Sequence, residues 1–94
     1  MEFLAEVHVN LPGSLQGEEL EDLRTRERAR GKELWRAGVI KRIWKIPGKK
    51  DVLAVYEAAD ATALQETFET FPMYPYLDID VYPLAGHALE KEPR

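Results

Sequence analysis

The stretch from Phe71 to Val81 most constrains what this chain can fold into. Pro72 and Pro75 end a preceding helix and hold an extended aromatic corner. From position 77 onward, apolar and acidic residues alternate: Leu77, Ile79 and Val81 on one side, Asp78 and Asp80 on the other. Such alternation predicts a strand with one apolar and one polar face, which needs earlier strands as its partners.

The rest of the chain supplies those partners together with two helices. Periodicity and turn residues predict a strand over Phe3–Leu11, a helix over Glu18–Ala37, strands over Val39–Ile46 and Asp51–Glu57, a helix from Asp60 to about Phe71, and a strand over Tyr76–Tyr82. Gly38 is the expected stop of the first helix, and Asp60 is the expected N-cap of the second. Pro47-Gly48 predicts a turn that joins the two middle strands as a hairpin.

The order of these elements is βαββαβ. It predicts an α+β, ferredoxin-like domain, in which a four-stranded antiparallel sheet carries both helices on one face. The 94 residues are enough for one such domain over residues 1–94. No signal-peptide pattern and no run of ~20 apolar residues is visible, so we expect a cytoplasmic protein without a membrane partner. The net charge of −4 argues against binding to nucleic acid.

Small size predicts self-association. A core of this size leaves a small stability margin, and the absence of cysteine removes disulfides and thiolate metal sites as supports. Helices cover only one sheet face, yet the second predicted strand is apolar on both: simple alternation places Val39 and Ile43 on one face, and Ile40, Trp44 and Ile46 on the other. An open apolar face usually marks an interface. We therefore expect a homo-oligomer, with the tail over residues 83–94 packing on a neighbouring subunit; a tail folded over its own sheet is the alternative.

Glu27 is the strongest candidate for chemistry. It lies within the apolar stripe of the first predicted helix, formed by Leu20, Leu23, Glu27, Gly31 and Leu34. A carboxylate on a buried stripe loses solvation, so its pKa should rise, and Gly31 leaves room beside it. The pattern predicts a small-molecule niche next to a general base. The structural alternative is an ion pair between Glu27 and Lys41 or Arg42.

The remaining polar residues give weaker signals. His8 lies on the polar side of the first strand, where it is either an acid or base or an interface residue. Because His87 is far away in the tail and neither histidine has spaced acidic partners, we expect no metal site. The candidates to hold an anionic substrate are Lys41, Arg42 and Lys45. No glycine-rich phosphate loop, nucleophile elbow or dinucleotide fingerprint occurs.

Several sequence blocks, in order and over nearly the full chain, resemble the muconolactone Δ-isomerase family. They are Met1-x-Phe3, Val9-Asn10-Leu11-Pro12, Arg26-Glu27-Arg28-Ala29, Leu34-x-Arg36-Ala37-Gly38, Arg42-Ile43-Trp44-Lys45-Ile46-x-Gly48 and Phe71–Val81. The last block is the most specific, because it reads like the family's Leu-Pro-Leu-Phe-Pro-Tyr-Met-Asp-Ile-Glu-Val.

The resemblance implies a ferredoxin-like subunit in a ring-shaped oligomer, often a decamer. It also implies a bacterial isomerase of aromatic hydrocarbon catabolism in the β-ketoadipate pathway. The family moves a proton within muconolactone, an acidic butenolide, to give 3-oxoadipate enol-lactone without a metal or organic cofactor. For this reaction we predict Glu27 as the catalytic base, with Lys41 and Tyr76 stabilising the dienolate. The predicted substrate-binding residues are His8, Arg42, Trp44 and Asp78.

The chain departs from the family pattern in two places. Lys50–Ala54 stands where the family usually reads Tyr-Ala-Asn-Tyr-Ser, and Gly86-His87-Ala88 stands where its tail usually reads Arg-His-Pro. Two alternative functions follow. One is an isomerase of a different lactone, and the other is a non-catalytic oligomeric binding or regulatory protein that would need no carboxylate at position 27.

Overall fold

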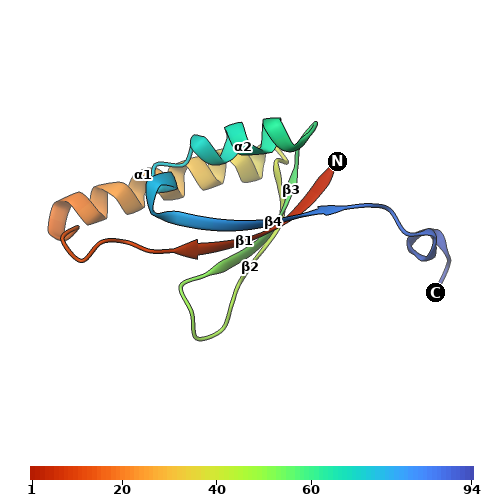
Figure 1. Cartoon of the computed structure of the whole chain (residues 1–94), viewed down its shortest axis with the longest axis horizontal. Helices are drawn as coiled ribbons and strands as arrows, with labels where there is room; N and C mark the ends of the chain where they lie inside the picture. The colour runs from red at the N-terminus through yellow and green to blue at the C-terminus, as the bar shows by residue number, and fades with distance from the viewer.

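The computed structural model describes all 94 residues and confirms the βαββαβ order (Figure 1). Its elements are β1 (Glu2–Val9), α1 (Gly17–Arg36), β2 (Ile40–Lys45), β3 (Val52–Glu57), α2 (Ala61–Glu69) and β4 (Leu77–Leu84), with short 3-10 turns η1 (Tyr74–Tyr76) and η2 (Ala88–Lys91). The strands form one antiparallel sheet in the order β2-β3-β1-β4. Both helices lie on one face of it, as the ferredoxin-like prediction requires.

Local signals set the limits of the helices. The Asp60 carboxylate accepts a hydrogen bond from the backbone N–H of Ala63 at 2.8 Å, so Asp60 is the predicted N-cap of α2. Gly38 has a φ of +76° directly beyond the C-cap of α1, a conformation in which a Cβ would be strained. The helix α2 ends at Glu69, two residues before the predicted Phe71, and the chain then turns toward β4.

The strand β4 runs through Pro83 to Leu84, two residues past its predicted end. It is an edge strand that pairs only with β1, where Pro83 lies opposite Phe3. An edge strand tolerates a proline because one row of its N–H groups has no partner in the sheet. The strand therefore carries the chain beyond the body of the domain.

The core lies between the sheet and the two helices. It consists of Phe3, Ala5, Leu34, Ile40, Ala54, Tyr56, Leu64, Phe68 and Phe71. The rings of Tyr56 and Phe68 meet edge to face, with 5.2 Å between their centroids, which ties β3 to α2. This contact packs α2 against the covered face of the sheet.

A β-bulge in β2 corrects the predicted faces of that strand. Ile40 pairs with Tyr56 and Ile43 pairs with Ala54, so Lys41 is an extra residue without a partner. The bulge brings Ile40 and Ile43 to the same, helix-covered face. Simple alternation placed them on opposite faces, because alternation along one strand carries no information about an inserted residue.

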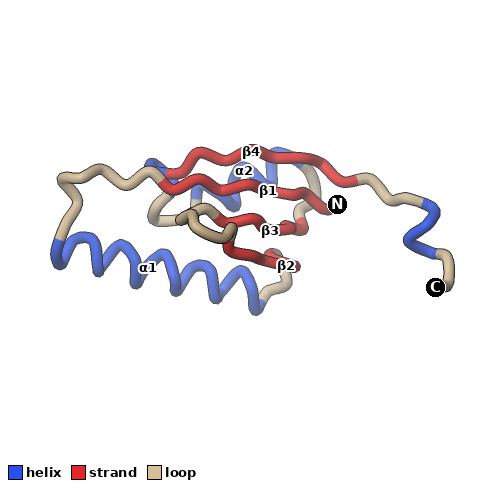
Figure 2. Tube along the Cα trace, turned by 90° about the horizontal axis from the view of Figure 1, so that it is seen from below, coloured by secondary structure: helices blue, strands red, loops and turns tan.

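The opposite face of the sheet carries no helix and keeps large apolar side chains. Trp44 is 40% exposed and Tyr82 is 49% exposed, and they lie at the two outer strands. Residues from Val81 onward are exposed, and the C-terminal segment extends away from the rest of the molecule (Figures 1 and 2). No helix of the protein is both long enough and apolar enough to cross a membrane.

Candidate functional site

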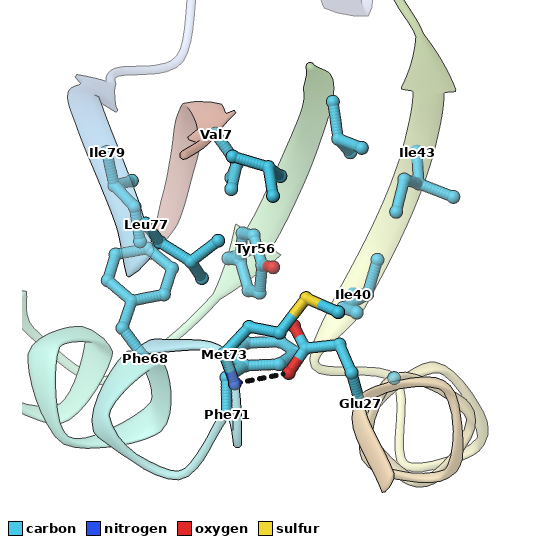
Figure 3. Close-up of a pocket in the computed structure, with 13 residues that line it drawn as sticks. Val7, Glu27, Ile40, Ile43, Tyr56, Phe68, Phe71, Met73, Leu77 and Ile79 are labelled. Atoms are coloured by element: carbon cyan, nitrogen blue, oxygen red, sulfur yellow. Dashed lines mark hydrogen bonds between the residues drawn. The ribbon is translucent and has the colours of Figure 1, made fainter. Parts of the chain in front are cut away.

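A cavity of about 290 Å³ opens between the sheet and the helices beside Glu27 (Figure 3). Its sheet wall includes Val7, Ile40, Ile43, Val52, Tyr56 and Ile79. Its other wall includes Glu27 and Gly31 from α1, Phe68 from α2, and Phe71 and Met73 from the segment that follows. Among all the lining residues Glu27 alone carries a charge. The predicted niche beside this carboxylate is therefore present in an almost entirely apolar setting.

One oxygen of Glu27 is held by the backbone. The N–H of Met73 donates to Glu27 Oε1 at 2.9 Å, and no protein donor is paired with Oε2. Glu27 takes part in no salt bridge, so the alternative of an ion pair with Lys41 or Arg42 is wrong. Burial raises the pKa of the Glu27 carboxyl, and the Met73 hydrogen bond offsets part of that rise. The result is an oriented carboxylate with one free oxygen.

The aromatic corner of the chain supplies that backbone donor. Two hydrogen bonds, from Tyr74 N–H to the Phe71 carbonyl and from Tyr76 N–H to the Met73 carbonyl, fold the segment after α2 into tight turns. Pro72 lies between Phe71 and Met73 and prevents α2 from continuing. The stretch that most resembles the family thus places the Met73 amide against α1.

Tyr56 is a second polar residue of the cavity, and sequence reasoning missed it. Its side chain is only 4% exposed, its hydroxyl makes no hydrogen bond within the protein, and it points into the cavity (Figure 3). Burial, together with the nearby charge of Glu27, raises the pKa of Tyr56 to about 12. The hydroxyl therefore stays protonated and remains a hydrogen-bond donor at neutral pH. The sequence did contain a signal for Tyr56. It lies two residues from Ala54 in the same strand, so the two side chains share the covered face.

Two predicted catalytic partners lie away from the cavity. Lys41 is exposed at the bulge of β2, where its charge contributes to lowering the pKa of Glu57, behind the larger effect of the chain's amino terminus. Tyr76 lines a separate hollow near the start of α1, together with Leu23 and Pro72. Within one chain, the structure does not bring either residue together with Glu27.

The four predicted substrate-binding residues share the open face of the sheet. The guanidinium of Arg42 stacks over the Trp44 ring at 4.8 Å from its centroid. His8 and Asp78 lie opposite each other in the pairing of β1 with β4. The sheet itself separates all four from the cavity, so a single chain does not use them together with Glu27.

His8 is the centre of an ionic cluster on that open face. Its Nδ1 lies 3.0 Å from Asp51 Oδ2, its Nε2 lies 3.2 Å from Asp80 Oδ2, and Glu6 Oε2 lies 3.9 Å from Nε2. The Asp51 hydrogen bond is the main cause that raises the pKa of His8. Spacing along the chain suggested no acidic partners for this histidine. In the structure, the pairing of β1 with β4 brings Asp80 close to it, and the β2–β3 hairpin brings Asp51.

The chain matches known proteins over almost its full length. A sequence model of the muconolactone delta-isomerase family matches residues 1–90. Muconolactone Delta-isomerase 2 of Acinetobacter lwoffii is 31% identical over 88 residues, which cover 94% of this chain and 92% of that protein. The muconolactone Delta-isomerase of Rhodococcus opacus is 28% identical over 85 residues, which cover 90% and 91%.

Solved structures agree with the sequence matches. A crystal structure of muconolactone isomerase superposes with a TM-score of 0.89 at 26% identity, covering all of this chain and 98% of the other. A 5-chloro-2-hydroxyhydroquinone dehydrochlorinase of Burkholderia phenoliruptrix AC1100 superposes with a TM-score of 0.68 at 17% identity, covering 98% and 100%, and shares the fold alone. By its family match and its shared architecture, this chain belongs to the muconolactone delta-isomerase family and is an isomerase.

Proposed function

We propose that this protein moves a proton within muconolactone, or within a closely related acidic butenolide, to give the enol-lactone isomer in aromatic catabolism. The observation that carries this proposal is the oriented Glu27 carboxylate in an almost entirely apolar cavity of about 290 Å³. That volume is near the lower end of the ~300–1,000 Å³ typical of small-molecule pockets, which suits one small ring.

The free oxygen of Glu27 acts as the base in this proposal. It removes the ring proton from the carbon that bears the carboxymethyl arm. The electron pair of that bond spreads through the ring as a dienolate onto the lactone carbonyl oxygen. Glu27 then returns the proton to the carbon next to the carbonyl, which completes the shift of the double bond. The raised pKa of Glu27 makes it a stronger base than a solvated carboxylate.

Tyr56 supports the dienolate in the same proposal. Its hydroxyl is fixed in the cavity wall and protonated, so it can donate a hydrogen bond to the carbonyl oxygen as negative charge develops there. This is the role that the sequence suggested for Tyr76, which lies outside the cavity. Because one carboxylate removes and returns the proton, the step as written uses no metal or organic cofactor.

Turnover of a small panel of butenolides tests this function. We expect purified protein to convert muconolactone with a change in ultraviolet absorbance, and to convert at least one other carboxylate-bearing butenolide more slowly. The isomer should form without added metal or cofactor. If no acidic butenolide is converted at micromolar protein, the proposed reaction on this substrate class is wrong.

We also propose a cytoplasmic homo-oligomer, with a decamer as the specific expectation, built from single-domain subunits. Exposed apolar residues on the open sheet face support it, as does a tail over residues 83–94 that extends from the body with Leu89 72% exposed. Multi-angle light scattering at micromolar concentration should give a mass several times that of the 10.8 kDa chain. A stable monomer would contradict the assignment of the open face and the tail as interfaces.

A further inference from the structure

The basic residues of α1 fall into two groups. Arg24, Arg26 and Arg30 each lie within 3.3 Å of a carboxylate oxygen from the same helix. Arg28, Lys32 and Arg36 have no such partner, although the helix is rich in acidic residues. Spaced four residues apart, these three follow one another along a single face of the helix. They form a row of unneutralised positive charge.

That row lines a groove next to the cavity. The groove has a volume of about 400 Å³ and is bounded by Arg28, Lys32 and Arg36, with Trp35 beside them. Gly31, Ile40 and Ile43 belong to the walls of both the groove and the cavity. The apolar cavity and the basic groove are therefore neighbouring compartments with a shared boundary.

Gly31 leaves this boundary open. A Cβ built at Gly31 would meet no atom within 4 Å, so no packing contact within the chain requires a glycine here. A glycine inside a helix costs about 1 kcal/mol relative to alanine. The missing side chain instead leaves space beside Glu27 on the side where the groove begins.

We propose that Arg28, Lys32 and Arg36 form the subsite for the carboxylate arm of the substrate, with the lactone ring in the cavity and the arm passing over Gly31. The inference rests on the proposed function and names its ligand class: small lactones that carry a free carboxylate. The cavity holds no cation, and a carboxylate buried there without a partner would lose its solvation. The groove also separates the arm from the negative charge of Glu27. Lys41 and Arg42, which the sequence suggested for this role, line neither compartment.

Binding measurements with a charged and a neutral ligand test the subsite. The probes are muconolactone and its methyl ester, titrated calorimetrically into protein that carries Glu27→Gln so that neither is converted. Adding Arg28→Gln and Lys32→Gln should raise the Kd of the acid about tenfold, since contacts to charged groups are strong but these are partly exposed. The Kd of the ester should stay the same, which also shows that the cavity is still folded. The matched control is Arg24→Gln with Arg26→Gln, which removes the same charge from the same helix and should change neither Kd.

Steady-state kinetics distinguish a failure of the subsite proposal from a failure of the proposed function. With Glu27 intact, Arg28→Gln and Lys32→Gln should raise the KM for the acid and leave kcat nearly unchanged, because the arm is bound equally in the ground and transition states. Equal Kd values for the acid in parent, groove variant and control would overturn the subsite, as would a parent that binds neither probe. If the groove dependence is found but wild-type protein converts no butenolide, the subsite stands and the proposed reaction on butenolides fails.

Discussion

Replacing Glu27 with glutamine is expected to lower kcat on the true substrate by about 10²–10⁴-fold, the usual contribution of a positioned base. Glutamine keeps the size of the side chain, and its carbonyl oxygen can still accept the hydrogen bond from Met73 N–H. It cannot take the ring proton. The measurement is the initial rate by ultraviolet absorbance. Glu33→Gln, on the exposed side of the same helix, is the matched control and should keep normal turnover.

The pH dependence of the same reaction gives a second reading of Glu27. The base must be ionised, so kcat/KM should fall as pH decreases through the raised pKa of Glu27, which lies above that of an ordinary glutamate.

The stability of the fold depends on pH in the opposite direction, because the contribution of Glu27 to the free energy of unfolding decreases as pH rises through this pKa. Because folding raises this pKa, the native state favours the protonated form, and ionisation at neutral pH lowers the free energy of unfolding. Glu27→Gln should therefore be at least as stable as wild type near pH 7 by thermal denaturation. If the variant keeps near-wild-type turnover, the base is elsewhere, and His8 is the next residue to test.

Replacing Tyr56 with phenylalanine should lower kcat by about 10²-fold, the lower range for removal of one donor to a developing oxyanion. The ring remains, so the edge-to-face contact with Phe68 and the packing of β3 on α2 should persist. The reduction should appear in kcat more than in KM, because the hydrogen bond strengthens as charge reaches the carbonyl oxygen.

Tyr76→Phe is the informative control for Tyr56→Phe. It removes the same hydroxyl from a tyrosine that lies outside the cavity, so its kcat should remain close to wild type. If Tyr76→Phe is strongly impaired and Tyr56→Phe is not, then the dienolate is stabilised by a group from outside this cavity. The role of Tyr56 would then be only structural.

Local sequence information predicted the helices and the carboxylate that lines the cavity. A helical stripe is set by neighbours along the chain, so a carboxylate among Leu23, Gly31 and Leu34 was visible without a structure. The expectation that its pKa rises agrees with the structure, and so does the expected space beside it. The Asp60 cap and the Pro47-Gly48 turn are local in the same sense.

Features that depend on pairing between strands were not visible in this way. The bulge puts both Ile40 and Ile43 on the face that lines the cavity, whereas simple alternation along β2 separated them. Sheet register likewise gives His8 an acidic partner that lies 72 positions away in the chain. The basic groove was overlooked for a different reason. In the sequence, alternating charges on a helix look like an ordinary solvated face. Only the structure shows which basic residues form ion pairs and which have no acidic partner.

The bulge at Lys41 also makes β2 tolerant of a change in length at that point. In a regular strand, removing one residue would reverse every side chain on one side of the deletion, because side chains alternate between the two faces. Removing Lys41 instead removes the extra residue, so Ile40, Arg42 and Ile43 would lie opposite Tyr56, Val55 and Ala54 one for one. Both isoleucines would keep the helix-covered face and their place in the shared wall of the cavity and the groove. A designer could therefore shorten β2 here, and remove an exposed charge, without reversing the side chains that line both compartments.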